Sequence, residues 1–192
     1  MTGLSVIIAE DEAVTRMMLR ARLERLGHRV VAECENGAQA VLAAKQHQPE
    51  LAILDIRMPE MDGIEAAKAI INDHPCAIMF LTGFVEDELV EKAGEAGALA
   101  YLLKPFRKED LGPAIEIAMR RFKELQLRNK EVTELTEALE TRKLIERAKG
   151  ILMDRHGLSE DEAFKRIHFQ ARNQNRKMKD IAMSIITAAD LI

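Results

Sequence analysis

Five short apolar runs in the first half of the chain constrain its fold more than any other feature. They occupy residues 4–9, 29–34, 51–55, 76–81 and 99–103. Runs such as 6–9 and 77–81 are continuously apolar, which is typical of strands buried on both faces of a parallel sheet. Helical patterns lie between the runs, at residues 12–26, 37–47, 63–72 and 86–96. We therefore predict an α/β fold with a doubly wound, five-stranded parallel sheet over residues 1–112.

From Glu109 onward the pattern is helical. A long helix is predicted from Ala114 to Arg155, and Pro113 suits its first turn. Apolar residues recur along it every three or four positions, as in a short coiled coil, with Asn129 and Thr136 on the same seam. The seam comprises Ile115, Ala118, Phe122, Leu125, Val132 and Leu139. We interpret residues 113–141 as a linker helix that pairs with a second copy; the alternative is an amphipathic helix folded on its own domain.

The last part of the chain, residues 142–192, predicts a small three-helix all-α domain. Gly157 is expected to end the long helix in a left-handed conformation. Ser159 and Glu162 form a capping-box pattern that starts the next helix. Two amphipathic helices follow, at residues 160–172 and 177–191, separated by a polar break. Because two short helices cannot bury a core alone, we expect them to pack on the end of the long helix.

Composition excludes several classes of protein. The sequence has no apolar stretch of the roughly 18 residues that a membrane-spanning helix needs. It begins without the basic segment of a signal peptide, and Cys34 and Cys76 form no disulfide framework, so we expect a cytoplasmic protein. The net charge is −4, but residues 142–192 carry 11 Lys and Arg against 7 Asp and Glu. A basic C-terminal part after an acidic one indicates a partner of negative charge.

Reactive side chains are predicted at one edge of the sheet, since ligands of open α/β sheets bind beyond the carboxyl ends of the strands. Glu10 and Asp11 follow the first strand, Asp55 closes the third, Thr82 follows the fourth and Lys104 follows the fifth. Clustered carboxylates repel one another unless a cation joins them, and oxygen ligands without His or Cys suit Mg²⁺. We therefore predict a magnesium site with Asp55 as a nucleophile toward phosphorus. Lys104 and Thr82 would bind phosphoryl oxygens.

These residues lie in motifs that resemble the receiver domain of response regulators, over residues 1 to 120. The motifs are Ile8-Ala9-Glu10-Asp11-Glu12, Leu54-Asp55-Ile56-Arg57-Met58-Pro59, Met61-Asp62-Gly63, Leu81-Thr82-Gly83 and Leu103-Lys104-Pro105. The resemblance implies a flavodoxin-like fold and phosphoryl transfer from a sensor histidine kinase to Asp55. It implies that Mg²⁺ is held by Asp11, Asp55 and the Arg57 backbone carbonyl, with Glu10 acting mostly through water. It also implies a switch in which Thr82 moves toward the phosphoryl group and Tyr101 turns inward.

The C-terminal part resembles the ANTAR domain of transcription antitermination regulators. The matching stretches are residues 144–153, 159–164 and 179–182, and Ala148-Lys149-Gly150-Ile151-Leu152-Met153 is the most specific of them. The resemblance implies a three-helix unit that recognises paired hairpin loops in leader transcripts and prevents a terminator from forming. In its second helix the family usually has Leu-Arg, where this chain has Ile167-His168.

Basic and amide side chains of this part are expected to contact RNA. The predicted phosphate contacts are Arg142, Lys143, Arg147, Lys149, Arg172, Arg176, Lys177 and Lys179. Asn173, Gln174 and Asn175 are predicted to read base edges. Two of the basic residues have an alternative role, since Lys149 suits the tethering of a helix end and Arg147 suits an ion pair with Glu146 across a dimer.

The sequence therefore predicts a two-component response regulator that is phosphorylated on Asp55 and acts as an RNA-binding transcription antiterminator. We expect it to form a homodimer when phosphorylated, to have no membrane partner and to turn over no metabolite. Two alternatives stay open. One is a DNA-binding response regulator with a helix-turn-helix, and the other is a phosphorylation-controlled protein-interaction module that binds no nucleic acid.

Overall fold

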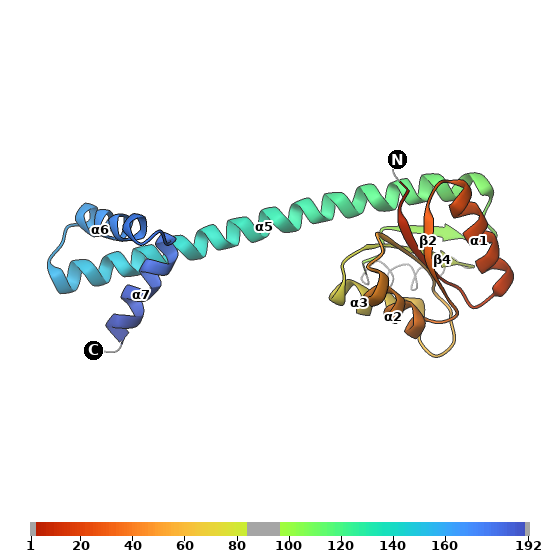
Figure 1. Cartoon of the computed structure of the whole chain (residues 1–192), viewed down its shortest axis with the longest axis horizontal. Coiled ribbons are helices and arrows are strands. Elements are labelled where there is room, and N and C mark those ends of the chain that lie inside the picture. The colour runs from red at the N-terminus through yellow and green to blue at the C-terminus, as the bar shows by residue number, and fades with distance from the viewer. Residues whose placement is uncertain (1–2, 84–96, 191–192) are drawn as a thin grey trace. The chain divides into compact units, whose positions relative to one another are not determined.

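The computed structural model describes residues 3–83 and 97–190 (Figure 1). The chain divides after Gln126 into two compact units, and each is described by itself. The helix predicted at residues 86–96 lies outside the described residues. Among the described helices, none is both long enough and apolar enough to cross a membrane.

The first unit contains a five-stranded parallel sheet, as predicted, and every strand begins and ends within one residue of its expected position. The strands are β1 (Ser5–Ala9), β2 (Arg29–Cys34), β3 (Leu51–Asp55), β4 (Ala77–Thr82) and β5 (Ala100–Leu103), in the order β2-β1-β3-β4-β5. Three helices of this unit are α1 (Ala13–Arg25), α2 (Gly37–His47) and α3 (Gly63–Asp73). The switch in strand order at β1 and β3 places the ends of these two strands beside each other.

Helices cover both faces of the sheet, which explains why its strands are continuously apolar (Figure 1). On one face, Leu19 and Leu23 of α1 pack with Ile8 and Ile53. The first turns of the long helix α5 (Lys108–His156) contribute Leu111, Ile115 and Ala118 to the same core. On the opposite face, α2 and α3 pack against alternate residues of the same strands. The two cores hold the strand ends in fixed register.

The long helix α5 (Lys108–His156) begins six residues before the predicted start, so Pro113 lies inside it rather than in its first turn. Proline lacks an N–H and removes one helical hydrogen bond. Packing outweighs this loss, because Leu111 and Ile115 lie four residues apart and are both buried against the sheet. Asp110 also stabilises the start of the helix, because its Oδ2 accepts the backbone N–H of Arg107 at 2.8 Å.

The predicted coiled-coil seam is corrected at its N-terminal end. Ile115 and Ala118 are buried in the core of the first unit, so they are not available to a second copy. Farther along α5, Leu125, Val132 and Leu139 are 43%, 61% and 60% exposed. An apolar seam exposed to solvent therefore starts beyond Phe122.

The second unit packs α6 (Glu160–Asn173) and α7 (Met178–Asp190) on the end of α5, as expected. Its core is built from Ala148, Leu152, Ala163, Ile167, Ala171, Ile181, Ala182 and Ile186. Gly157 has a φ of +62° and ends α5 in the predicted left-handed conformation. The capping box of Ser159 and Glu162 is present at the start of α6.

Candidate functional site

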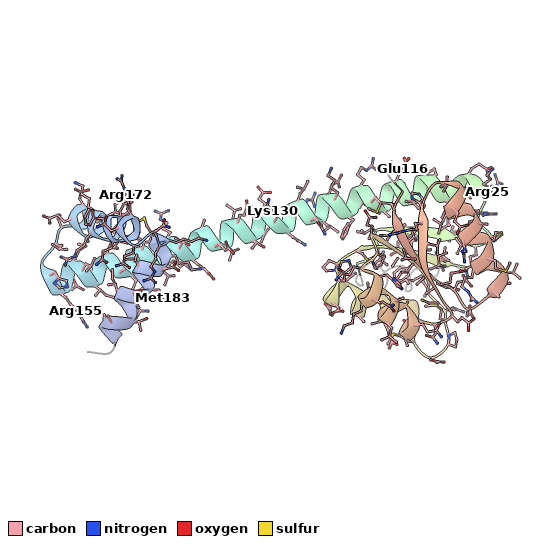
Figure 2. All side chains as sticks on the ribbon, in the orientation of Figure 1. Arg25, Glu116, Lys130, Arg155, Arg172 and Met183 are labelled. Carbon is pink, nitrogen blue, oxygen red and sulfur yellow. The ribbon has the colours of Figure 1, made fainter. Side chains whose placement is uncertain are left out.

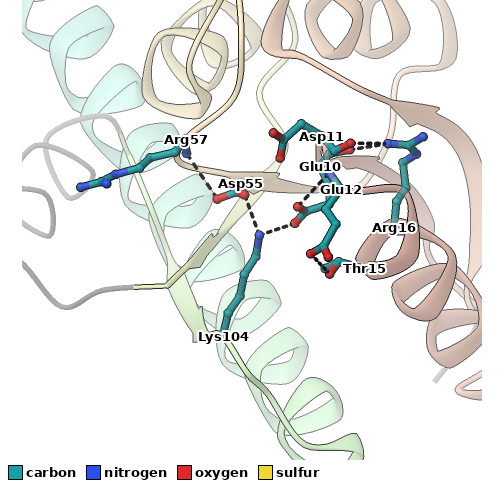
Figure 3. A network of polar contacts seen from close by, with 8 residues as sticks. All are labelled: Glu10, Asp11, Glu12, Thr15, Arg16, Asp55, Arg57 and Lys104. Atoms are coloured by element: carbon teal, nitrogen blue, oxygen red, sulfur yellow. Dashed lines mark hydrogen bonds and ion pairs between the residues drawn. The ribbon is translucent and has the colours of Figure 1, made fainter.

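The carboxyl ends of β1 and β3 bring three carboxylates together (Figure 3). Glu10, Asp11 and Asp55 each offer an oxygen, and these oxygens lie within 4.8 Å of one another. Glu10 and Asp55 are buried and Asp11 is exposed, so the cluster opens toward solvent beside Asp11. The backbone N–H of Arg57 donates to Asp55 Oδ1 at 3.3 Å, while the Arg57 side chain points away from the carboxylates.

Lys104 connects two of the three carboxylates. Its Nζ lies 2.6 Å from Oδ2 of Asp55 and 2.6 Å from Oε2 of Glu10. The Glu10 oxygen is buried and accepts no well-directed hydrogen bond, so this contact is an ion pair. When all three carboxylates are ionised, the single ammonium leaves the cluster with an excess of negative charge. Such a site attracts a cation.

Burial and the neighbouring charges act on both members of this ion pair. Burial raises the pKa of Glu10, and the Asp55 carboxylate adds to the rise, while Lys104 opposes it. Burial alone would lower the pKa of Lys104, but its hydrogen bond to Asp55 and the charge attraction of both carboxylates outweigh burial and raise the pKa. Lys104 is therefore positively charged over the whole physiological range.

Of the two residues predicted to switch, Thr82 lies at the end of β4 beside the strand that carries Asp55, and Tyr101 lies on β5, where it pairs with Phe80. Thr82 is buried at the end of β4, and its carbonyl accepts the backbone N–H of Lys104 at 2.7 Å. Tyr101 is half-buried, its ring centroid lies 6.3 Å from that of Phe80, and burial raises its pKa. Their movement on phosphorylation stays a prediction.

Two arginines that sequence reasoning missed hold the loops that follow β1 and β5. The Arg16 guanidinium donates to the carbonyls of Glu10 at 2.6 Å and Asp11 at 3.4 Å, and pairs with Glu35 at 2.9 Å. Arg16 therefore fixes the loop after β1. No local sequence signal marks it, because an arginine near the start of an amphipathic helix is usually solvated.

Arg22 has the same effect on the loop after β5. Its guanidinium lies 5.0 Å from the centroid of the Phe106 ring and donates to the Phe106 carbonyl at 3.2 Å. The peptide bond between Lys104 and Pro105 is cis. Arg22 thus holds the segment that directly follows Lys104, although Arg22 and Phe106 are 84 positions apart in the sequence.

The Met61-Asp62-Gly63 motif lies against the end of β3 that carries Asp55. A Cβ at Gly63 would lie 2.0 Å from the backbone oxygen of Asp55, so only glycine allows α3 to start so close to β3. Asp62 caps α3, because its side chain accepts the backbone N–H of Glu65 at 2.8 Å. The motif therefore has a packing role directly beneath Asp55.

In the second unit, most of the predicted RNA contacts are exposed, and Figure 2 shows the Arg172 side chain directed outward from α6. The exposed ones are Arg142, Lys143, Arg147, Arg172, Asn173, Gln174, Asn175, Arg176 and Lys177. Asn175 has a φ of +50°, so the polar break turns through a left-handed residue that is not glycine. Lys179 is half-buried, and its Nζ lies 3.8 Å from Glu140.

Lys149 is corrected as a phosphate contact. It is buried, and its Nζ lies 2.9 Å from Glu146 and 2.6 Å from Glu160. These two carboxylates occupy the ammonium and connect α5 to the first residue of α6. Lys149 therefore has the alternative role considered above, that of tethering a helix end.

Two family profiles match the chain. The receiver domain of response regulators matches residues 6–116, and the ANTAR domain matches residues 133–186. The transcriptional regulatory protein PdtaR of Mycobacterium tuberculosis is 47% identical over 181 residues, which cover 94% of this chain and 88% of PdtaR. The chain is a response regulator of the ANTAR type. Its domain order, an N-terminal receiver followed by an ANTAR domain, is the one predicted from the sequence motifs.

Other similar proteins match this response regulator over its receiver domain alone. The chemotaxis protein CheY of Bacillus subtilis is 42% identical over 57% of this chain and 92% of CheY. The receiver domain of the response regulator NarL from M. tuberculosis has a TM-score of 0.58 at 29% identity, covering 62% of this chain and 98% of that domain. These likenesses confirm the flavodoxin-like receiver fold.

Proposed function

We propose that this response regulator accepts a phosphoryl group from a histidine kinase on Asp55 and, in that state, binds hairpins in leader RNA and prevents transcription termination. The observation that carries the proposal is the ion-paired cluster of Glu10, Asp55 and Lys104 at the sheet edge, in a chain that also has an ANTAR domain. The proposal includes no turnover of a metabolite, since the chemistry is confined to phosphorylation and slow hydrolysis at Asp55.

The carboxylate cluster fits Mg²⁺. All its donors are oxygens, they lie within 4.8 Å of one another, and a buried Glu10 oxygen lacks a directed hydrogen bond. Oxygen ligands about 2.0–2.1 Å from the ion are what Mg²⁺ prefers. Asp11 and Asp55 would hold the ion directly, with the Arg57 carbonyl, and Glu10 would act through water. When bound, Mg²⁺ would neutralise charge that develops on the transferring phosphoryl oxygens.

Asp55, Lys104 and Thr82 each have a different role in the proposed phosphoryl transfer. A carboxylate oxygen of Asp55 attacks phosphorus and forms a P–O bond, while the P–N bond of the phosphohistidine breaks and its electron pair stays on the imidazole nitrogen. Lys104 exchanges its contact with Asp55 for one with a phosphoryl oxygen. The Thr82 hydroxyl hydrogen-bonds a second phosphoryl oxygen.

The first turns of α1 offer a surface on which the kinase would dock. Val14 and Met17 are 70% and 69% exposed, and they lie just after the acidic loop that carries Asp11. Exposed apolar side chains beside a reactive site are typical of a protein interaction surface. Docking there would place a phosphohistidine near Asp55.

Pairing of two copies would follow from the exposed seam of α5. Leu125, Val132 and Leu139 share a spacing of seven residues, which matches a coiled-coil repeat. A dimer would bury them and present two ANTAR domains, one for each of two hairpins. Phosphorylation would then act as a population shift toward the dimer, and a shift from mostly monomer to mostly dimer requires a bias of a few kcal/mol.

Gel shifts at equal protein concentration test the proposal. The full chain is incubated with acetyl phosphate and Mg²⁺, then with tandem-hairpin RNA, duplex DNA or no nucleic acid, and the mass in solution is measured in parallel. We expect retention of the RNA and a dimer mass, and neither effect in Asp55→Asn. Retention of DNA alone would support the helix-turn-helix alternative. Retention of neither nucleic acid would support the protein-interaction module.

A further inference from the structure

A basic stretch of sequence without any carboxylate follows the acidic first turn of α6 and continues through the turn after that helix. Residues 163–179 contain six Lys and Arg and no Asp or Glu. They are Lys165, Arg166, Arg172, Arg176, Lys177 and Lys179. In a chain whose net charge is −4, this concentration of positive charge complements a polyanion.

Three aromatic rings lie within this basic stretch and are exposed. Phe164 is 43% exposed and Phe169 is 64% exposed, and His168 is exposed as well. The rings of Phe164 and His168 are nearly parallel, at 15°, with centroids 6.4 Å apart. All three rings line one shallow hollow on α6, together with Lys165, Arg166 and Glu162. Lys165 pairs with Asp161 one turn earlier, while Arg166 extends the positive charge of the hollow. We refer to Phe164, His168 and Phe169 as the α6 ring surface.

The core of the domain does not require these rings. The buried face of α6 is formed by Ala163, Ile167 and Ala171, which pack against α5 and α7. Phe169 lies on the opposite side of the helix from this face, because it follows Ile167 by two residues, about 200° around the helix. A large apolar ring kept in solvent contact among cations is the composition expected of a nucleic-acid surface, where bases stack on aromatic side chains.

We propose that the α6 ring surface stacks with unpaired bases of an RNA hairpin loop, while the cations of residues 163–179 contact the adjoining phosphates. This inference rests on the proposed RNA-binding function and names the part of the RNA that is recognised. Arg172 extends the surface, since it lies four residues after His168 on the same face of α6 and its planar guanidinium also stacks on bases.

The absence of tryptophan from the sequence makes stacking directly measurable. Phe169→Trp introduces the chain's one indole within the proposed surface. The probe is an RNA hairpin with a fixed stem and a randomised loop, and the comparison is the same stem as a loopless duplex. The full chain, treated with acetyl phosphate and Mg²⁺, is titrated with each. We expect the indole fluorescence to fall with the looped RNA and to stay unchanged with the duplex.

Affinity measurements separate stacking from charge. Phe169→Leu, which keeps an apolar side chain without a ring, should bind the looped RNA about tenfold more weakly with an unchanged salt dependence. Arg176→Ala should reduce the slope of log affinity against log salt by about one. Met183→Ala, which removes an exposed apolar side chain of α7 outside the basic stretch, is the matched control and should change neither.

Three results would overturn the inference. If the wild-type chain retains looped RNA but Phe169→Leu binds equally well and the indole is not quenched, the ring surface is wrong and the proposed function stands. If the wild-type chain retains no looped RNA, both the proposed function and this inference are refuted. If Phe169→Leu instead lowers the mass of the protein in solution from that of a dimer to that of a monomer, the α6 ring surface is a protein–protein interface.

Discussion

Lys104→Met removes the cation that lies between Glu10 and Asp55, and it is the substitution for which the structure gives the clearest magnitude. At an effective dielectric constant of 20, two charges 2.6 Å apart attract by about 6 kcal/mol before desolvation is subtracted. Removal of one partner from a buried ion pair typically costs about 3–5 kcal/mol, because the remaining charges stay buried and unpaired. We expect a loss of about 3 kcal/mol, since Lys104 keeps 23% of its side chain exposed.

Mg²⁺ should restore much of this loss. A ligand at 100 times its dissociation constant stabilises the folded state by about 2.7 kcal/mol. Because Lys104 and the ion neutralise the same carboxylates, the gain from Mg²⁺ should be larger in Lys104→Met than in the wild-type chain.

Urea unfolding followed by circular dichroism, with and without Mg²⁺, measures both effects. Arg20→Met is the matched control, because Arg20 pairs with Glu24 and Glu33 on the exposed side of α1 and its loss should leave the midpoint almost unchanged. If Lys104→Met unfolds at the wild-type urea concentration, and if Mg²⁺ moves neither midpoint, the carboxylates do not repel and the electrostatic reasoning is refuted.

Three further changes test other parts of the structure. Ile167→Ala, at a fully buried position of the ANTAR core, should cost about 2–4 kcal/mol, and a thermal transition of the C-terminal unit that does not move would contradict the packing described. Ser159→Ala removes the cap of α6 and should cost about 1 kcal/mol in the same assay, whereas Ser159→Asp should retain most of it. Because burial raises the pKa of Glu10 above its ordinary 4.5, the folded chain keeps that proton after the unfolded chain has lost it, so the free energy of unfolding without Mg²⁺ should fall as the pH rises above 4.5. Glu10→Gln should flatten that part of the pH profile, and an identical slope in both proteins would assign the titration to another group.

The strands and the acidic cluster could be predicted because the sequence encodes them locally. Each apolar run is shorter than a typical helix and bounded by turn residues, which favours a strand. The parallel topology then brings the strand ends together, and Glu10, Asp11 and Asp55 meet as expected. The strand order therefore brings residues that are distant in the sequence together in one site.

The contacts that were not predicted join residues whose proximity depends on the folded tertiary structure. Arg22 and Phe106 are distant in sequence, and nothing near either residue indicates that they meet. Lys149 was expected first as a phosphate contact, yet the turn at Gly157 brings Glu160 back to its ammonium. Pro113 locally predicts a later start for α5, but the burial of Leu111 in the tertiary structure favours a helix that begins at Lys108.

Intact mass spectrometry of the full chain with acetyl phosphate tests the central claim most directly, namely that a carboxylate beside an acidic metal site accepts the phosphoryl group. We predict that the wild-type chain gains the mass of one phosphoryl group with Mg²⁺ and gains none when EDTA replaces the ion. Asp55→Asn should gain none in either condition. A labelled Asp55→Asn chain, or equal labelling of the wild-type chain in EDTA, would contradict the claim.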